Sequence, residues 1–484
     1  MNGTAVRKSL FLAASAALLA ALLVASAGCS SAGSAGSSQS DYDKAYAIGL
    51  QAYTYGLPLL ETNKTFLTMT SVNVSGGNGF GPVNQFNHVR TPNDPTSKAV
   101  VAPGANALSS IAWLDLSKEP QVLHVPEVTD HDFVLALLDP YTEDLRNLGT
   151  AHATPAGDYV VCGPGQHDAR LPAGVQRIGV DYTRIWIIGS TQLKGQDDVA
   201  NVNKIQDGYA LTPLSKYGTA YQPPAPAQPD TTVDTYDVPT GLAFFDTLGQ
   251  LLQQFPPPAA DKAQLAALAT VGIGPGKTPS SNSHLSADTV RGLKDAVAAG
   301  PAQIQADTKT IFASSAKKHN SYFLGGFGTY GTDYQLRAVV AVMGLGAFTS
   351  DQAVFAMTLS DANAKSLDGS SSYTIHMAAE PPADEGWTLT VYDTKGALIQ
   401  NPIGRYQLSN TSALTKNADG SVDIHLQATQ PADAAQAQNW LPVAGGQDFE
   451  VIWRLLAPKP DAISGILDGS GWQPPSVAPP GAGN

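Results

Sequence analysis

Two long stretches of the chain consist of short apolar runs separated by Gly, Pro and Asp, and this pattern limits the fold most. The first stretch, residues 99–217, contains VLHVPEV, DFVLALLD, GDYVVCG and TRIWIIGS. The second, after Ser350, contains SSYTIHM, GWTLTVYD, GALIQN, SVDIHLQA and FEVIWRLL. Apolar runs of this length, many of them alternating with polar residues and bounded by turn residues, predict β-strands. The 46 glycines and 34 prolines among 484 residues argue against a purely helical bundle.

Helical periodicity occupies the remaining parts of the chain. DYDKAYAIGLQAYTYG, from Asp41, repeats apolar residues on one face, and Pro58 is expected to end this helix. TGLAFFDTLGQLLQQF, AADKAQLAALATVG, SADTVRGLKDAVAAG and PAQIQADTKTIF predict helices separated by PPP and GP breaks. DYQLRAVVAVMGLGAF, from Asp333, predicts one more helix, which is apolar almost all round and therefore buried. We predict an α+β fold, mainly β, with two antiparallel β-sandwich or jelly-roll-like domains and a helical segment between them.

The N-terminus has the pattern of a bacterial lipoprotein signal. Arg7 and Lys8 precede an uncharged run, Ser9–Gly28, that ends in Ser-Ala-Gly before Cys29. This predicts cleavage before Cys29 and lipidation of its thiol, for example with palmitate, so that the protein is lipid-anchored to the bacterial cell membrane on its extracytoplasmic side. A transmembrane helix is the alternative, but it leaves the cysteine unexplained, and the many Ala and Ser residues weaken it.

These patterns divide the chain into six segments. They are a signal peptide (1–28), a flexible tether (29–40), an N-terminal β-rich domain (41–225), a Pro-rich linker with a helical segment (226–332), a C-terminal β-rich domain (333–475) and a disordered tail (476–484). If Cys29 carries lipid, Cys162 has no partner for an internal disulfide. The formal net charge of −13 argues against nucleic acid as a partner.

A search for catalytic and metal-binding motifs excludes several classes of protein. The sequence has no HExxH, paired CxxC, GxSxG or EF-hand motif, and its nine histidines form no close ligand pair. We therefore predict no metal site and assign no cofactor. Gly326–Gly331 fits GxGxxG, but no βαβ series surrounds it, so a tight turn before a buried helix is the better interpretation. Asp130-His131-Asp132 is interpreted as a solvated turn.

Several ordered blocks resemble known bacterial families. Four of them, AYTYGLPLL (52–60), NQFNHVR (84–90), AWLDLSKEPQVLHVP (112–126) and GDYVVCGPG (157–165), resemble domain of unknown function 1254. Six more, YGTDYQLRA (330–338), GWTLTVYD (386–393), NPIGRYQL (401–408), NADGSVDI (417–424), NWLPV (439–443) and FEVIWRLLAP (449–458), resemble domain of unknown function 1214. The resemblance implies two β-rich domains with helices between and around them, and it implies no particular reaction.

One block departs from the family pattern. The family usually has Pro-Asn-x-Asp-Thr-Leu-Tyr-Ser where this chain has PGANALSS (103–110). The acid, the threonine and the phenol are replaced here by Asn106, Ala107 and Ser109. Loss of a carboxylate and a phenol removes a charge and an acid/base group, so this member is either a binding protein or a changed catalyst.

Three classes of function remain. The first is an envelope enzyme, a hydrolase or lyase of small amphiphilic molecules, with its site in a cleft between the domains. The second is a lipoprotein that binds a ligand without turnover, and the third is a structural surface scaffold. The expected partners are the membrane, through the lipid, and a small molecule; no oligomeric state is assigned.

For the enzyme, the candidate residues are polar or titratable groups, and Asp139, Tyr141, Tyr392 and Asn401 are included because polar residues at strand ends often line the mouth of a site. The catalytic candidates are His88 as base, Arg337 and Tyr392. The binding candidates are Arg90, Asn106, Asp139, Tyr141, Asn401 and Arg405, and the three arginines among all these candidates would hold an anion. Each has a structural alternative: Arg337 would pair with Asp333 at i, i+4, and Tyr392 would be a sheet residue with a satisfied hydroxyl.

Overall fold

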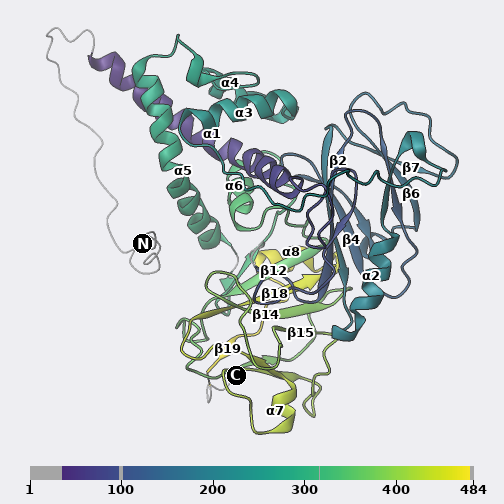
Figure 1. Cartoon of the computed structure of the whole chain (residues 1–484). Coiled ribbons are helices and arrows are strands. Elements are labelled where there is room, and N and C mark those ends of the chain that lie inside the picture. The colour runs from purple at the N-terminus through teal and green to yellow at the C-terminus, as the bar shows by residue number, and fades with distance from the viewer. Residues whose placement is uncertain (1–34, 98–101, 316, 480–484) are drawn as a thin grey trace, which may run out of the picture.

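The computed structural model describes residues 35–97, 102–315 and 317–479. The predicted signal peptide and Cys29 lie outside the described residues. Within them, the chain forms two sheet-rich parts and a group of helices that projects from one side of the sheets (Figure 1). This arrangement confirms the predicted α+β fold with two sheet-rich parts. Among the described helices, none is both long and apolar enough to cross a bilayer.

Two sheets form the N-terminal sandwich. One has the order β1-β2-β8-β4-β5, with strands Asn87–His88 (β1), Ala107–Asp115 (β2), Arg184–Gln192 (β8), Phe133–Leu138 (β4) and Asp144–Gly149 (β5). The other has the order β7-β6-β3-β9, with strands Gln176–Gly179 (β7), Gly157–Cys162 (β6), Gln121–Val125 (β3) and Ala210–Pro213 (β9). Neighbouring strands are antiparallel except β6 and β7.

Both faces of strand β4, which lies between β8 and β5, are covered. Leu135 on one face shares a core cluster with Leu123 of the opposite sheet. On the other face, Trp113 of β2 stacks on Trp186 of β8 at 4.7 Å, and Phe66 packs edge-on against Trp113. All six residues of β4 are therefore buried, and the turn that follows this strand is held in a fixed position.

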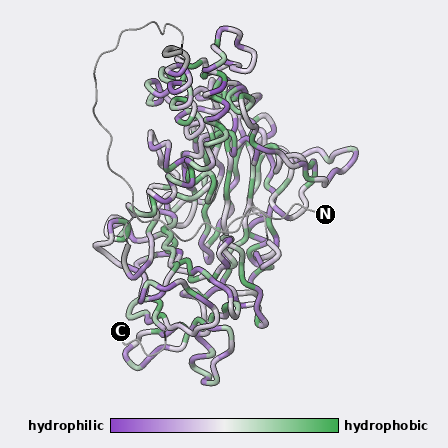
Figure 2. The backbone as a smooth tube through the Cα atoms, turned by 90° about the vertical axis from the view of Figure 1, so that its left-hand side faces the viewer, coloured by the Kyte–Doolittle hydropathy of each residue, from purple (hydrophilic) through white to green (hydrophobic). Residues whose placement is uncertain are grey.

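Two further sheets form the C-terminal sandwich. The first has the order β10-β11-β12-β18-β14-β15, with strands Lys317–Lys318 (β10), Ser321–Leu324 (β11), Ala353–Thr358 (β12), Phe449–Leu456 (β18), Trp387–Asp393 (β14) and Gln407–Ser409 (β15). The second has the order β17-β16-β13-β19, with strands Trp440–Pro442 (β17), Val422–Gln427 (β16), Tyr373–Met377 (β13) and Val477–Ala478 (β19). Trp387, Trp453, Ile375 and Ile424 share the core between these sheets. In Figure 2 the hydrophobic segments run mainly through the interior of the body, as this packing requires.

Eight α-helices lie in the described part of the chain. They are Ala35–Met69 (α1), Val199–Gly208 (α2), Leu242–Gln254 (α3), Lys262–Ala269 (α4), Ala287–Ser314 (α5), Tyr334–Met343 (α6), Ala434–Gln438 (α7) and Ile463–Asp468 (α8). Short 3₁₀ helices occupy 150–152, 196–198, 214–216, 259–261 and 279–281. Ala338 and Val339 of α6 pack in the same core as α1, α3 and α5, so α6 belongs by packing to the N-terminal part.

Two expected helix ends are wrong, and both lie at a proline. α1 continues through Pro58 to Met69, and α5 runs unbroken through Pro301. A proline in a helix interior costs about 3 kcal/mol, because it removes one N–H and crowds the preceding turn. Here α1 and α5 pack closely along each other: a Cβ on Gly300 would lie 2.5 Å from the ring of Tyr53. Tertiary packing along both helices outweighs the local penalty.

Other differences concern the edges of the predicted segments. GALIQN forms no strand, because the side chain of Asn401 binds the carbonyls of Ile399 and Arg405 and turns the chain there; only Leu398 makes a bridge. β19 lies in the segment expected to be a disordered tail, where Val477 is fully buried. α1 begins inside the predicted tether.

Candidate functional site

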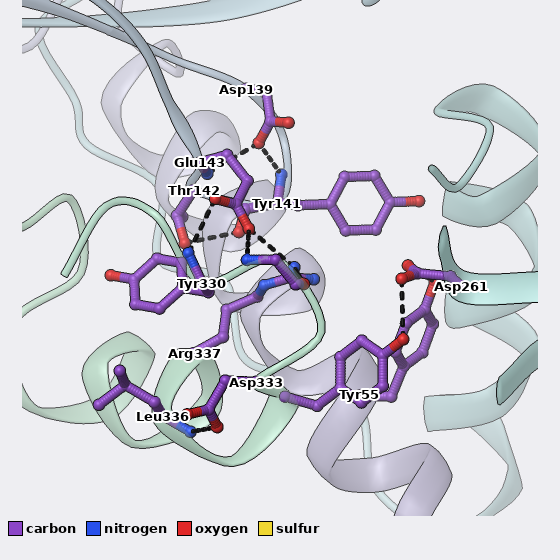
Figure 3. Close-up of polar contacts among 12 residues, drawn as sticks. Tyr55, Asp139, Tyr141, Thr142, Glu143, Asp261, Tyr330, Asp333, Leu336 and Arg337 are labelled. Carbon is purple, nitrogen blue, oxygen red and sulfur yellow. Dashed lines mark hydrogen bonds and ion pairs between the residues drawn. The ribbon is translucent and has the colours of Figure 1, made fainter. Parts of the chain in front are cut away.

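The structure brings three of the nine candidate residues together at one buried cluster. Asp139 and Tyr141 lie in the turn between β4 and β5, and Arg337 lies on α6, which packs beside that turn (Figure 3). Neighbouring side chains from α1, the loop between β7 and β8, the 3₁₀ helix at 259–261 and the loop before α6 complete it. We call this group the Arg337 cluster, and its members are Tyr55, Asp139, Tyr141, Glu143, Tyr182, Asp261, Tyr330, Tyr334 and Arg337.

Arg337 is held by Glu143. Asp333 caps α6 by accepting the amide N–H of Leu336, and this places Arg337 one turn into the helix, facing the β4–β5 turn. Arg337 Nη2 donates to Glu143 Oε1 at 2.8 Å and also to the carbonyl of Gly331. Arg337 is only 1% exposed. The expected alternative partner, Asp333, is therefore not the one that neutralises this charge.

Two nitrogens of Arg337 have no acceptor in the described structure. These are Nε and Nη1, which together carry three N–H donors. The guanidinium carbon lies 5.8 Å from the ring centre of Tyr141 and 5.7 Å from that of Tyr334. Aromatic faces stabilise a cation, but they do not replace hydrogen-bond acceptors. A buried cationic side chain with unpaired donors is rare, so this position is the first place to look for a ligand.

Asp139 is a second buried carboxyl group of the Arg337 cluster, and it feels the charge of Arg337 without pairing with it. Its Oδ1 accepts the amide N–H groups of Tyr141 at 2.8 Å and Glu143 at 3.0 Å, and Oδ2 has no contact among the residues drawn in Figure 3. The residue is 4% exposed. Burial raises the pKa of Asp139 to about 7, against the opposing effect of the two backbone hydrogen bonds and of Arg337. A carboxyl group with this pKa can take up or release a proton near neutral pH.

Tyrosines line the rest of the cluster and remain protonated. Tyr55 and Tyr334 donate their hydroxyls to the two oxygens of Asp261, at 2.9 and 2.8 Å, and Tyr141 donates to the carbonyl of Phe255 at 2.7 Å. Burial raises the pKa of Tyr334 to about 12 and raises the pKa of Tyr55 and Tyr141 further. The hydroxyl of Tyr330 is buried without a partner in the described structure.

His88 and Arg90 belong to a separate cluster on the other edge of the first sheet. We call it the His88 cluster, and its members are His88, Arg90, Ser110, Gln206 and Asp207. His88 Nδ1 lies 2.9 Å from Ser110 Oγ, and burial together with the charge of Arg90 lowers the pKa of His88 to about 4. Arg90 Nη1 donates to the carbonyl of Asn203 and to Gln206 Oε1, and Nη2 pairs with Asp207 at 2.6 Å. α2 thus covers a neutral histidine and a paired arginine.

The remaining candidates make structural contacts in the C-terminal sandwich, except Asn106, which lies directly before β2 in the N-terminal part. Tyr392 donates its hydroxyl to the carbonyl of Pro103, which fixes the loop that leads to Asn106, and the carbonyl of Asn106 accepts Leu193 N–H. Arg405 Nη1 donates to three carbonyls at the end of α7, those of Ala437, Gln438 and Trp440. A shallow hollow of about 500 Å³ lies beside Arg405 and Trp440. Neither region contacts the Arg337 cluster.

Sequence reasoning missed several members of the Arg337 cluster. Glu143 lies in LLDPYTEDL, two residues after Tyr141, and Tyr330 and Tyr334 lie in YGTDYQLRA with Arg337. Both blocks contain residues that were chosen as candidates. The density of Tyr and acidic residues in these blocks was the signal that could have identified Glu143, Tyr330 and Tyr334. Tyr55 is in AYTYGLPLL, but no sequence signal marks Asp261, because only the fold brings the 3₁₀ helix at 259–261 to α1.

No group of three or more His, Cys, Asp and Glu residues capable of holding a metal ion occurs in the described parts of the chain. His131 lies between Asp130 and Asp198, 2.8 Å from each, and is buried, so the expected solvated turn is in fact packed against the start of α2. Gly326, Gly328 and Gly331 have φ of +77°, +70° and +53°, which fits the predicted tight turn before a buried helix.

The fold and the cluster define an α+β protein with two sandwiches and a buried Arg–Tyr–Asp site at the junction of the N-terminal sheets with the helices. Residues 83–213 match the family described as Protein of unknown function (DUF1254), and residues 352–460 match Protein of unknown function (DUF1214). The chain therefore carries both domains in this order, which confirms the resemblance seen in the sequence. Asp139, Tyr141 and Glu143 lie inside the first match, whereas Arg337 lies between the two matches.

Two solved structures align with most of this chain. The VPA0106 protein from Vibrio parahaemolyticus is 21% identical, with a TM-score of 0.66 over 91% of this chain and 99% of that one. An uncharacterized protein from Burkholderia cenocepacia is 12% identical, with a TM-score of 0.42 over 92% of this chain and 96% of that one. The first likeness shows a shared fold. None of the curated proteins compared with the chain matches it.

Proposed function

We propose that the protein is an acid–base enzyme, a hydrolase or lyase, that acts on a small amphiphilic molecule at the Arg337 cluster. The observation that carries the proposal is the pair of unpaired nitrogens, Nε and Nη1, on an arginine that is 1% exposed and lies near the buried carboxyl group of Asp139. We assign the base to Asp139 rather than to His88, because His88 lies in another cluster and its pKa is lowered to about 4.

The chemistry follows from the two residues. In hydrolysis, Asp139 takes a proton from water as the water oxygen bonds to the substrate carbonyl carbon, and the displaced electron pair moves to the carbonyl oxygen beside Arg337. When this electron pair re-forms the carbonyl double bond, the bond from the carbonyl carbon to the leaving oxygen breaks. The leaving oxygen then takes the proton from Asp139. In a lyase reaction, Asp139 takes a proton from the carbon next to a carbonyl group, and the released pair expels a leaving group from the next carbon. The rings of Tyr141 and Tyr334 contact the apolar part of the substrate.

Access to the cluster requires movement of the loop before α6. Glu143, whose side chain is 20% exposed, and Tyr334, which is also partly exposed, are members that reach the surface. Its carboxylate accepts the amide N–H groups of Tyr330 and Gly331, both at 2.9 Å, so it fastens the loop Gly326–Gly331 over Arg337. Three glycines with positive φ in this loop allow changes of backbone direction that other residues resist.

The test uses two reactions that need the same pair of residues. The full chain is incubated with p-nitrophenyl butyrate, whose hydrolysis releases a coloured phenolate, and with phenylacetone in D₂O, whose α-proton exchange is followed by NMR. We expect acceleration of at least one reaction, and a loss of about 10²- to 10⁴-fold in Asp139→Asn. Acceleration of neither reaction, or equal rates in the variant, would overturn the proposal.

A matched control separates the acid–base role of Asp139 from its role in the turn. Asp393 also accepts two backbone N–H groups in a turn, those of Lys395 and Ala397, both at 2.9 Å. Asp393→Asn removes the same kind of charge from the same kind of turn in the other sandwich. Turnover should be unchanged in this variant.

The location of the enzyme forms a second part of the proposal. We propose that lipid on Cys29 anchors the mature protein to the cell membrane on its extracytoplasmic side, because small residues precede this cysteine at the end of an apolar run. Cys29→Ser should release the protein from membrane fractions and abolish incorporation of radiolabelled palmitate. Cys162→Ser is the control and should change neither, since the thiol of Cys162 is buried in β6. Continued lipid labelling of the Cys29 variant would refute the anchor.

A further inference from the structure

We propose that the substrate presents an uncharged acceptor oxygen, such as the carbonyl oxygen of an ester, amide or ketone, to Arg337, and that the cluster selects against carboxylates. This inference rests on the proposed function and specifies its substrate class. It differs from the expectation that Arg337 holds an anion.

The first step is the charge of Arg337, which is already neutralised. Glu143 lies 2.8 Å from Arg337 Nη2, and the pair is partly removed from water. What Arg337 still offers is hydrogen bonds, from Nε and Nη1. What Nε and Nη1 lack is therefore a hydrogen-bond acceptor, and a neutral oxygen atom can serve as that acceptor.

The second step is the charge around that position, which is negative. Asp261 accepts two phenol hydroxyls, and donation from neutral phenols leaves its carboxylate charge in place. Asp139 adds further negative charge when it ionises. Burial raises the pKa of Tyr141, the negative charges of Asp139 and Asp261 raise it further, and the positive charge of Arg337 lowers it. An added carboxylate would be repelled by these groups at short range and low dielectric, which corresponds to a factor of about ten or more in affinity.

The third step excludes a cationic ligand. Negative surroundings attract a cation, but the two atoms of Arg337 without partners in the described structure, Nε and Nη1, are donors. A cation placed there would leave them unpaired and would face a guanidinium. A neutral acceptor satisfies both conditions, and the rings of Tyr141 and Tyr334 beside the guanidinium provide contact for an apolar or aromatic group.

The test compares three flat molecules of nearly the same shape and different charge: benzamide (neutral), benzoate (negative) and benzamidine (positive). Their binding to the full chain is measured at pH 7.5 by ligand-observed NMR. We expect benzamide to bind about tenfold or more tightly than either ion. Glu143→Gln, which keeps the shape but removes one charge, should raise the affinity of benzoate relative to benzamide by about tenfold. Arg337→Gln should weaken benzamide by a similar factor, and the control Arg90→Gln should leave all three affinities unchanged.

Each other outcome overturns the assignment. Benzoate or benzamidine binding as tightly as benzamide would show that charge is not selected as proposed, and absence of binding by all three would remove the carbonyl class. The proposed function fails in a different way. If Asp139→Asn keeps full turnover while benzamide still binds best, the substrate class stands and the acid–base role is wrong. If Asp139→Asn loses turnover while benzoate binds best, the acid–base role stands and the proposed substrate class is wrong.

Discussion

Arg90 and Arg337 were both expected to hold a ligand, and the structure puts them in opposite situations. Arg90 is partly exposed, and its two terminal nitrogens donate to groups on α2, namely Asn203, Gln206 and Asp207. Arg337 is buried, and only one of its three nitrogens has acceptors in the described structure. The presence of an arginine in a polar sequence block therefore does not show that this arginine binds a ligand. What distinguishes the two is the number of donors that the folded chain leaves without an acceptor.

The comparison is tested most directly by removing each guanidinium. Arg337→Gln should lower the turnover of the proposed reactions by about 100-fold or more, because a buried donor to the substrate oxygen is lost. Arg90→Gln should change turnover by less than about threefold, since its donors serve the packing of α2. The measurement is kcat/KM for p-nitrophenyl butyrate or the exchange rate of phenylacetone. Equal losses in both variants would break the distinction between the clusters.

Some members of the Arg337 cluster could be predicted from the sequence, and others could not. Asp139 and Tyr141 were chosen because polar residues at strand ends often line the mouth of a site, and Arg337 was chosen as an anion-holding group. Asp261 could not be chosen, because its position next to Tyr55 depends on the docking of a 3₁₀ helix more than 200 residues away along the chain. The partner of Arg337 was also missed: the i, i+4 rule favours Asp333, but that carboxylate caps the helix, and Glu143 reaches Arg337 from the other side.

The fold was predicted more completely than the site, and the reasons are physical. Strands such as β4 and β14 are determined by local patterns of apolar residues and by nearby turns. The expected helix ends at Pro58 and Pro301 were wrong because the local penalty of proline is smaller than the gain from packing α1 against α5. That gain depends on Gly300 and Tyr53, which are distant in sequence. Local signals therefore establish the elements, while long-range packing sets their ends and assembles the site.

A second prediction concerns the pH dependence of stability that Asp139 produces. Its pKa is about 7 in the folded chain and about 3.9 in the unfolded chain, so the folded state binds more protons between these values. Stability from this group is therefore present below pH 4 and is lost as the pH rises to 7. The free energy of unfolding, measured as wild type minus Asp139→Asn, should fall by about 2–3 kcal/mol between pH 5 and pH 8. A difference that stays constant with pH would contradict a buried, titrating Asp139.

The His88 cluster should show the opposite sign. The pKa of His88 is lowered to about 4, below the ordinary value of 6.5, so the folded state binds fewer protons between these values. Stability from His88 is present above pH 6.5 and is lost as the pH falls toward 4. Measured by urea unfolding, the difference between wild type and His88→Gln should fall by about 1–2 kcal/mol from pH 7 to pH 5. A slope of the same sign as for Asp139 would show that burial does not govern this histidine.

The last prediction separates two tyrosines inside the Arg337 cluster. Tyr55 donates its hydroxyl to Asp261, so Tyr55→Phe leaves a buried carboxylate with one donor fewer and should cost about 1–3 kcal/mol of stability. The hydroxyl of Tyr330 has no partner in the described structure, so Tyr330→Phe should change stability by less than about 0.5 kcal/mol. If this hydroxyl serves the substrate, the same variant should lower kcat/KM by about three- to tenfold. Unchanged turnover in Tyr330→Phe would leave Arg337 as the donor to the substrate oxygen, whereas a large loss of stability would show that Tyr330 is a structural residue.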